Sequence, residues 1–414
     1  AEALRLVAGA SLDDSGASDA PDDADWSELV AGPWLAQTLQ GLRQPEGLAR
    51  VSPGTALKAT LRPYQEAGVR WLYLLTQLGL GACLADDMGL GKTIQVLAHI
   101  LAERAAKRLT GPTLIVMPTS LIPNWCSEAK RFAPVLKVLT LHGPDRAAKF
   151  SQIAAHDVVL TTYALLFRDE DELAKPKFAL AVFDEAQAIK NPQAKAALAA
   201  RRIRADRRIV MSGTPLENHL GELWAQVDLV LPGLLGPQKA FATRFRTPIE
   251  KFGDDARSKI LEKRLKPFLL RRTKSEVARD LPAKTEITRP VALEGGQREL
   301  YETLRLAMNK KVRDAVAARG IKQSSIVVLD ALLKLRQACC DPALVKLPSA
   351  RKVKGSAKRE MLLEMLAELI EEGRRVLVFS QFTEMLDLIE TDLDAQKIPY
   401  LRLDGSTIDR ATPV

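Results

Sequence analysis

The strongest indication of chemistry lies in residues 84–93, which read Leu-Ala-Asp-Asp-Met-Gly-Leu-Gly-Lys-Thr. They follow an apolar run and precede a stretch with the spacing of an amphipathic helix over 94–105, the context that a phosphate-binding loop requires. Gly89 and Gly91 allow the backbone to turn tightly, so that successive N–H groups point at phosphate oxygens. Lys92 would reach the β- and γ-phosphates, and Thr93 would offer its hydroxyl to Mg²⁺.

This loop departs from the most general phosphate-loop pattern at one position. The pattern GxxxxGK followed by Ser or Thr expects a glycine at position 86, where the chain has Asp86. A shorter GxGKT form is common in helicase-like ATPases, so the absence of the first glycine favours that class of nucleotide-binding protein. The alternative interpretation is a chance glycine-rich turn before a helix.

An acidic pair supplies the other half of a nucleotide site. Residues 178–183 form an apolar run that ends in Asp184 and Glu185. At the carboxyl edge of a parallel sheet, Asp184 would hold Mg²⁺ and Glu185 would polarise the attacking water. Alone, such a pair is often only a solvated strand end. About 90 residues after a phosphate loop, it predicts a nucleotide hydrolase.

These residues need a sheet to position them, and the chain predicts one. Short apolar runs bounded by Gly or Pro alternate with helix-like stretches, which is typical of βαβ units and a parallel sheet. The predicted strands are 81–85, 113–117, 135–141, 158–162, 178–183 and 208–211. Strands nearly vanish between about 236 and 350, where helical spacing dominates over 258–265, 297–318 and 325–338. A second βα pattern follows, with helices predicted over 362–369 and 384–395 and strands over 376–379 and 400–403.

Composition sets the broad class. The chain has 414 residues, of which 47% are hydrophobic and 27% charged, which excludes a disordered, collagen-like or coiled-coil protein. Net charge is +9, although residues 1–30 carry eight acids and one base, so the rest is basic enough to suit a polyanionic partner.

Residues 11–25 are small and acidic and predict disorder within a flanking region, 1–56. No membrane-spanning stretch, export signal or zinc-type CxxC pair is visible, and a cytosolic protein is expected.

Ten segments of this sequence, in the same order, closely resemble the Swi/Snf family of helicase-like DNA translocases in helicase superfamily 2, over about residues 57–410. They are LRPYQEAGVRWL (61–72), LADDMGLGKT (84–93), TLIVMPTSLIPNW (113–125), VVLTTYALL (158–166), DEAQAIKN (184–191), MSGTPLENHLGELW (211–224), FLLRRTKSEV (268–277), LRQACCDPAL (335–344), RVLVFSQFTEML (375–386) and LRLDGST (401–407).

The resemblance implies an α/β fold of two RecA-like lobes, each a parallel sheet flanked by helices, with helical protrusions between them. The implied domains are a flanking region, 1–56; an ATP-binding lobe 1, 57–235; the protrusions and lobe connection, 236–350; and the start of a truncated lobe 2, 351–414. It also implies that ATP and Mg²⁺ are the cofactors and that double-stranded DNA is the track. Nothing matches the last two family motifs, which carry the arginine fingers, so we expect a bacterial-type fragment with weak activity or none by itself.

Further site residues follow from the resemblance. In the phosphate loop, Asp87, Met88 and Leu90 would join the four residues named above, and Gln65 would contact adenine, its alternative being an exposed helix glutamine. The segment Asp-Glu-Ala-Gln at 184–187, here called the acidic box, has Gln187 where the family more commonly has histidine. Gln187 would hydrogen-bond to Ser212 or Thr214. The segment Ser212, Gly213 and Thr214 would couple hydrolysis to lobe movement. Unaided, it reads as a strand-to-helix turn with a capping hydroxyl.

The resemblance also places contacts to the DNA backbone on small polar residues after strands of both lobes: Thr119, Ser120, Thr161, Thr162, Ser380, Gln381, Gly405 and Ser406. Hydroxyl groups suit phosphate oxygens, and the alternative is plain loop capping. Basic clusters at 201–208, 310–313 and 351–359 read either as solvated surface or, for the last, as a phosphate contact.

The resulting hypothesis is a monomeric, ATP-dependent translocase on double-stranded DNA that remodels protein–DNA complexes, in a bacterial cytosol or nucleoid and without a membrane partner. One alternative keeps the ATPase and changes the partner to RNA polymerase or another protein–nucleic acid complex. A second is a non-hydrolysing scaffold, and a third is a helicase that separates strands.

Overall fold

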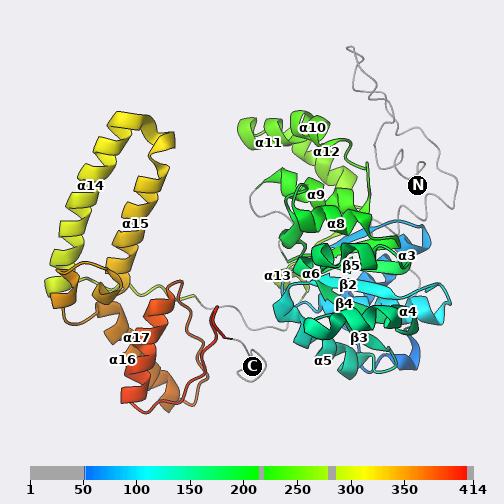
Figure 1. Ribbon diagram of the computed structural model, residues 1–414, viewed down its shortest axis with the longest axis horizontal. Coiled ribbons are helices and arrows are strands. Elements are labelled where there is room, and N and C mark those ends of the chain that lie inside the picture. Colours follow the sequence, from blue (N-terminus) through cyan, green and yellow to red (C-terminus); the bar gives the residue numbers. More distant parts are fainter. Residues whose placement is uncertain (1–50, 52, 214–218, 278–285, 408–414) are drawn as a thin grey trace. The chain divides into compact units, whose positions relative to one another are not determined.

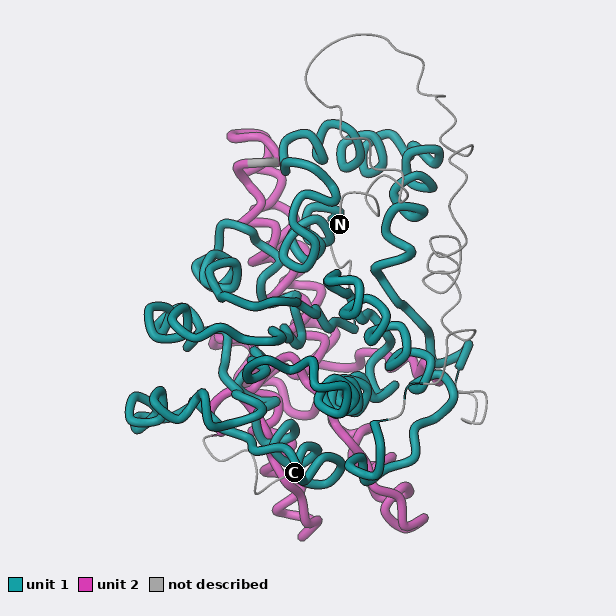
Figure 2. The backbone as a smooth tube through the Cα atoms, turned by 90° about the vertical axis from the view of Figure 1, so that its right-hand side faces the viewer, with its two compact units in different colours: residues 1–282 teal, residues 283–414 magenta. Residues whose placement is uncertain are grey.

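The computed structural model describes residues 51, 53–213, 219–277 and 286–407. The chain divides into two compact units, residues 1–282 and 283–414, which are coloured separately in Figure 2. The division at residue 282 falls inside the stretch predicted to be helical, 236–350. Almost all of the predicted flanking region, including the acidic segment 11–25, lies outside the described residues.

A parallel sheet forms the centre of the first unit (Figure 1). Its seven strands in the described residues are β1 (Ala82–Leu84), β2 (Thr113–Met117), β3 (Val138–Thr140), β4 (Val158–Thr162), β5 (Phe178–Phe183), β6 (Ala205–Met211) and β7 (Leu269–Leu270), in the order β3-β4-β2-β5-β6-β1-β7. All six predicted first-lobe strands are confirmed. The two-residue strand β7 was not predicted, because it lies in a region of helical spacing and pairs with β1 across 186 residues of sequence.

Helices cover both faces of this sheet. They are α3 (Pro63–Gln77), α4 (Lys92–Ala105), α5 (Ile122–Phe132), α6 (Tyr163–Arg168), α7 (Glu170–Leu173), α8 (Lys195–Arg202), α9 (Leu220–Val230), α10 (Gln238–Phe241), α11 (Thr247–Phe252), α12 (Asp255–Leu265) and α13 (Lys274–Val277), with a π-helical turn over Ala242–Arg246. Short 3-10 turns include η3 (Gly54–Ala56), η4 (Thr119–Leu121) and η6 (Ala186–Ile189), and a longer 3-10 segment, η5, covers Pro144–Ala155.

Alternating side chains along the strands divide the interior into two cores. On β2, Ile115 and Met117 join the core under α3, α4, α5 and α9, whereas Leu114 and Val116 join the core under α6 and α8. Strands buried on both faces are expected of a parallel sheet. The helix predicted as amphipathic, α4, is instead buried on nearly every side, because it packs between the sheet, α3 and α5.

The second unit is mostly helical in the described residues. It contains α14 (Gly295–Gln323), α15 (Ser325–Cys340), α16 (Ala357–Glu371) and α17 (Thr383–Ala395), with short 3-10 turns at Pro342–Leu344 and Ala350–Lys352. Figure 1 shows α14 and α15 as a long antiparallel hairpin. Gly320 interrupts α14 with a positive φ of 74°, and Gly373 ends the α16 segment with a φ of 72°. The predicted helices of this region are confirmed.

The strands predicted at 376–379 and 400–403 are corrected by the structure. Neither segment is a strand in the described residues, and Leu377, Phe379 and Leu401 are 83%, 87% and 77% exposed. A parallel strand needs ladder hydrogen bonds from a neighbour, and the described part of this unit supplies none for these two segments. The second sheet implied by the family resemblance is therefore not present in the described residues. No helix in the described part of the chain is both long and apolar enough to cross a membrane.

Candidate nucleotide site

Three loops meet at the carboxyl edge of the first-unit sheet. Because β6 lies between β5 and β1, the segment that starts at Ser212 leaves the sheet between the phosphate loop after β1 and Asp184 after β5. Ligands of open α/β sheets bind at this edge. The fold thus brings the two halves of the predicted nucleotide site together.

The phosphate loop wraps around its own lysine. The Lys92 ammonium donates hydrogen bonds to the carbonyl of Asp86 at 2.8 Å and to that of Asp87 at 3.4 Å. Gly89 and Gly91 have φ values of 83° and 76°, a left-handed region that suits glycine and turns the loop tightly. Lys92 begins α4, so the amide groups of that helix end face the loop. Lys92 is 8% exposed.

Asp86, where the general pattern expects glycine, anchors the loop. Its carboxylate is fully buried and accepts hydrogen bonds from the guanidinium of Arg272, through Nη2 and, at 2.9 Å, through Nε. The Arg272 backbone N–H and Gln95 Nε2 also donate to this carboxylate, both at 3.2 Å. The sequence predicts a structural role for Arg272, as part of a family Arg-Arg pair, and these contacts agree with that role. The pairing with Asp86 and the contribution of Gln95 were not predicted.

Gln65 is packed against the loop rather than exposed. Its side chain donates to the carbonyl of Leu90 at 3.1 Å and accepts from the backbone N–H of Arg62 at 2.9 Å. A Cβ atom at Gly91 would lie 2.5 Å from Gln65 Nε2, so a side chain there would collide with the glutamine. The alternative of a solvated helix glutamine does not fit this position.

Asp184 is held in place by two donors. Trp125 Nε1 donates to its Oδ2 at 2.8 Å, and the backbone N–H of Glu185 donates to its Oδ1 at 2.9 Å. Burial raises the pKa of Asp184, while the Trp125 hydrogen bond and the nearby Lys92 ammonium lower it. The Tyr163 hydroxyl donates to the Asp184 carbonyl at 2.7 Å. Trp125 and Tyr163 were not predicted as site residues, although both lie in the family segments.

Glu185 and Gln187 extend the site toward β6. Glu185 has a left-handed φ of 48°, unusual for a non-glycine residue and the kind of strain that clusters at functional sites. Gln187 Nε2 donates to Glu185 Oε2 at 2.6 Å, and Ser212 Oγ donates to Gln187 Oε1 at 3.3 Å. The glutamine in the acidic box therefore makes the predicted hydrogen bond to Ser212. Thr214 lies outside the described residues.

Gly213, the next residue after Ser212, lies against Met88 of the phosphate loop. A Cβ atom at Gly213 would lie 2.8 Å from Cγ of Met88. The Ser212–Gly213 segment therefore contacts both Gln187 and the phosphate loop.

The donors present fit a magnesium ion that is shared with a nucleotide. Mg²⁺ prefers oxygen ligands and commonly uses one or two carboxylates together with substrate phosphates. The buried Asp184 carboxylate, whose charged form is penalised by burial, gains from a neighbouring cation. No cluster of three metal-binding side chains occurs in the described residues, so the phosphates themselves would complete such a site.

The first-unit residues predicted to contact DNA differ in exposure. Thr119 and Ser120 are exposed in η4. Thr161 and Thr162 are buried at the end of β4, and the Thr162 hydroxyl accepts from the Leu165 N–H at 3.3 Å, capping α6. For Thr161 and Thr162 the geometry favours the alternative interpretation, a role inside the fold, because both residues are at most 2% exposed.

The second-unit residues predicted to contact DNA lie in turns. Ser380 Oγ bonds with the backbone of Phe382, and Gln381 Oε1 accepts from Arg336. Ser406 donates to Asp404 Oδ1 through its backbone and its hydroxyl, and Gly405 lies beside it. In the basic cluster 351–359, Arg359 pairs with Asp341 and Asp392, each at 3.3 Å, and is a structural residue.

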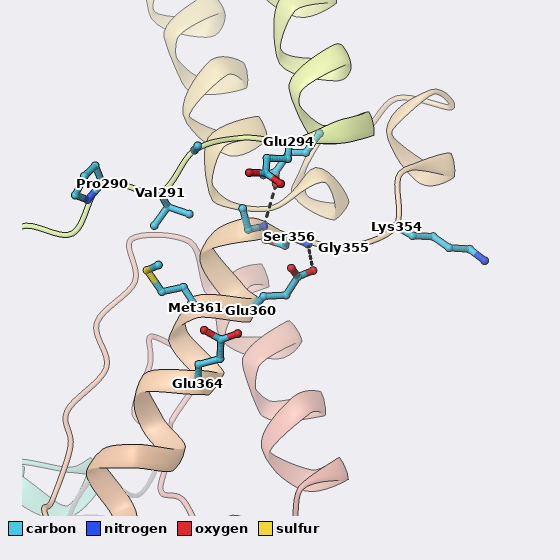
Figure 3. Close-up of a pocket in the computed structure, with 12 residues that line it drawn as sticks. Pro290, Val291, Glu294, Lys354, Gly355, Ser356, Glu360, Met361 and Glu364 are labelled. Carbon is cyan, nitrogen blue, oxygen red and sulfur yellow. Dashed lines mark hydrogen bonds between the residues drawn. The ribbon is translucent and has the colours of Figure 1, made fainter.

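A separate cavity of about 370 Å³ lies within the second unit, beside the start of α16 (Figure 3). Glu294, Glu360 and Glu364 line it, with Lys354 at its rim, and Glu360 accepts the Ser356 N–H at 3.0 Å. Three carboxylates repel a polyphosphate, so this cavity does not compete with the phosphate loop as the nucleotide site.

Comparison with known proteins gives one consistent family. The SNF2-related domain matches residues 64–344. The chain is 39% identical over 391 residues to a putative ATP-dependent helicase/translocase, YwqA, of Bacillus subtilis, covering 92% of this chain and 42% of that protein. It is 34% identical to human SWI/SNF-related matrix-associated actin-dependent regulator of chromatin subfamily A member 1, covering 86% of this chain and 35% of that protein. The chain thus spans less than half the length of these relatives.

The fold is also similar to a solved structure. The Sulfolobus solfataricus SWI2/SNF2 ATPase core in complex with double-stranded DNA has 35% sequence identity and a TM-score of 0.53, covering 84% of this chain and 74% of that one.

Proposed function

Because the chain belongs to the family of SNF2-related domains, we propose that it is part of an ATP-hydrolysing motor that moves along double-stranded DNA and remodels protein–DNA complexes. The observation that carries the proposal is the placement of the loop that ends in Lys92, after β1, and of the buried Asp184, after β5, at the carboxyl edge of one parallel sheet. A loop that presents amides and a lysine beside a buried carboxylate suits a metal-bound nucleoside triphosphate.

Binding would begin by moving Lys92. In this structure its ammonium is satisfied by the carbonyls of Asp86 and Asp87, and the β- and γ-phosphates are stronger acceptors because they are charged. Thr93 and Asp184 would hold Mg²⁺, which supplies charge neutralisation at the phosphate oxygens. Gln65, fixed on the loop through Leu90, would contact the base.

Hydrolysis would use the acidic box. Glu185 would orient a water for in-line attack on the γ-phosphate, and its left-handed φ of 48° turns the chain between β5 and η6. Gln187 bonds to both Glu185 and Ser212. Loss of the γ-phosphate would thus be communicated from the acidic box to the segment after β6, and from there to lobe movement along the DNA.

Duplex DNA is the proposed track. Support comes from the basic body of the chain and from the similarity to an ATPase core solved with double-stranded DNA. The exposed hydroxyls of Thr119 and Ser120 are suitable donors to backbone phosphates. A motor of this kind would work in the bacterial cytosol or nucleoid.

The test is ATP hydrolysis by the intact protein with and without duplex DNA. Wild type should hydrolyse ATP faster with duplex, whereas Lys92→Ala should lose at least about 100-fold in turnover, since charge stabilisation in such sites is worth that much. Lys130→Ala, an exposed lysine on α5, is the charge-matched control. Hydrolysis by Lys92→Ala at the wild-type rate would refute the site.

A second experiment separates the two candidate partners. It measures whether the protein, with ATP, displaces a repressor bound to duplex DNA or a stalled RNA polymerase.

A further inference from the structure

The segment after β7 runs alongside the phosphate loop. The backbone ladder of β1 and β7 continues past the end of both strands: Ala85 N donates to the Leu270 carbonyl at 2.7 Å, and Asp87 N donates to the Arg272 carbonyl at 3.0 Å. Residues 270–274 are therefore joined to the loop by main-chain hydrogen bonds, although they lie about 185 residues further along the sequence.

Side chains fix this segment in place. Arg272 binds the buried Asp86 carboxylate, and its Nη2 also donates to Gln95 Oε1 at 2.9 Å. Its Nη1 donates to the Tyr64 carbonyl, and its guanidinium lies over the Tyr64 ring. A buried arginine that makes two hydrogen bonds to one carboxylate has little conformational freedom. Arg272 therefore fixes the backbone position of Thr273 and Lys274, which follow it.

Lys274 lies against the phosphate loop. Its backbone N–H donates to Asp87 Oδ2 at 3.0 Å. The end of its side chain lies over Gly89, because a Cβ atom built on Gly89 would be 3.4 Å from both Cε and Nζ of Lys274. Within the described part of the chain, no acceptor or acidic side chain pairs with this ammonium.

We propose that Lys274 is a second phosphate-binding lysine of the nucleotide site, held over Gly89 by the Arg272–Asp86 pair and the Asp87 side chain, and that its ligand is the polyphosphate of a bound nucleotide. The inference rests on the proposed function and adds a residue to that site. A lysine is a compact, mobile cation, and the open side of a loop whose amides face phosphate is where a further positive charge is useful.

Binding of a fluorescent nucleotide tests the proposal on the full chain. Dissociation constants of N-methylanthraniloyl-ATP and the matching AMP derivative are compared for wild type, Lys274→Met and Arg271→Met. Arg271 is the exposed neighbour, so both variants lose one positive charge from the same segment. Lys274→Met should weaken ATP binding by about tenfold, as expected for one charge-assisted hydrogen bond, and should leave AMP binding unchanged. Arg271→Met should bind ATP within about twofold of wild type.

Two outcomes overturn the inference, and Lys92→Ala tells them apart. If Lys274→Met binds ATP like Arg271→Met while Lys92→Ala does not bind, the new assignment is wrong and the proposed nucleotide site stands. If Lys92→Ala also binds like wild type, both assignments are wrong.

Chemical protection gives a second reading that does not depend on a variant. Amine-selective acetylation, followed by peptide mass spectrometry, should show Lys274 protected by magnesium-ATP and not by AMP. Lys266, exposed in the same unit, is the unprotected control. Protection of Lys274 by duplex DNA but not by ATP would overturn the proposal in favour of a DNA contact.

Discussion

The Asp86 carboxylate replaces the glycine that opens the general phosphate-loop pattern, and it is the buried partner of Arg272. Asp86→Gly restores the general pattern but leaves the guanidinium buried and unpaired. Removing one member of a buried ion pair costs about 3–5 kcal/mol, so we expect the unfolding free energy of the first unit to fall by that amount in urea titrations.

The control for Asp86→Gly is an ion pair at the surface. Glu66 pairs with Arg70 on α3, and its side chain is 45% exposed. Glu66→Ala should cost no more than about 1 kcal/mol. Equal stabilities of Asp86→Gly and Glu66→Ala would contradict the anchoring role of Asp86.

His99, in the middle of α4, makes the first unit sensitive to acid. Neither ring nitrogen has a hydrogen-bond partner in the described part of the chain. Burial lowers the pKa of His99 from 6.5 to about 4; Glu103 opposes this shift, while Arg108 and Arg207 add to it. Between these pH values the unfolded chain binds a proton that the folded chain does not, so stability falls as pH falls from 6.5 toward 4, by roughly 3 kcal/mol.

The measurement for His99 compares wild type with His99→Leu in urea at pH 7 and at pH 5. Leucine removes the titrating group without leaving a polar atom unpaired, so the variant should lose less stability on acidification. Identical losses in the two proteins would show that other groups set the acid sensitivity.

At the same scale, the sequence predicted the residues whose chemistry is local and missed those that depend on tertiary contacts. The phosphate loop and Asp184 are predictable because glycine spacing and a strand end are features of neighbouring residues. The contacts of Arg272 with Asp86 and of Trp125 with Asp184 join residues 186 and 59 positions apart, and no periodicity carries that information. Thr162 is a local feature that the sequence could not interpret, because a hydroxyl at the end of a strand suits helix capping and phosphate binding equally well.

Among the elements, the contact of β1 with α9 has no room for an added atom. A Cβ on Gly81, just before β1, would lie 2.1 Å from the Val230 carbonyl oxygen at the end of α9. Because backbone rather than a flexible side chain would have to move, we expect Gly81→Ala to destabilise the first unit by about 3 kcal/mol. Gly405→Ala, which lies in the second unit and has nothing within 4 Å of the new Cβ, is the control and should leave the stability of its own unit unchanged in urea. A Gly81→Ala variant whose first unit is as stable as wild type would exclude this packing argument.

The strands also show where prediction from sequence stops. In the first unit, six buried apolar runs were found because each is flanked by turn residues and enclosed by helices. The runs 376–379 and 400–403 have the same apolar character, yet neither forms a strand among the described residues, and Leu377, Phe379 and Leu401 are exposed. A strand is a property of two segments, and an apolar run states only one of them.

At the scale of the whole molecule, each unit has its own hydrophobic core, which leads to a prediction about cooperativity. The clusters around Trp71 and Phe183 lie in the first unit, and those around Leu300 and Leu366 lie in the second. Domains that have their own hydrophobic cores commonly unfold as separate cooperative steps. We therefore expect two transitions in denaturant.

Ligand and core variants should act on different transitions. A non-hydrolysable ATP analogue with magnesium, at 100 times its dissociation constant, should stabilise only the first unit, by about 2.7 kcal/mol, and Lys92→Ala should abolish that shift. Leu393→Ala, in the second core, should lower only the other transition, by about 2–5 kcal/mol. All five tryptophans of the sequence lie within residues 1–282, three of them (Trp71, Trp125 and Trp224) among the described residues. Tryptophan fluorescence therefore reports the unfolding of the first unit. A single transition that moves with both the nucleotide and Leu393→Ala would mean that the two units fold as one, and that nucleotide binding at the first sheet edge is felt directly by the second core.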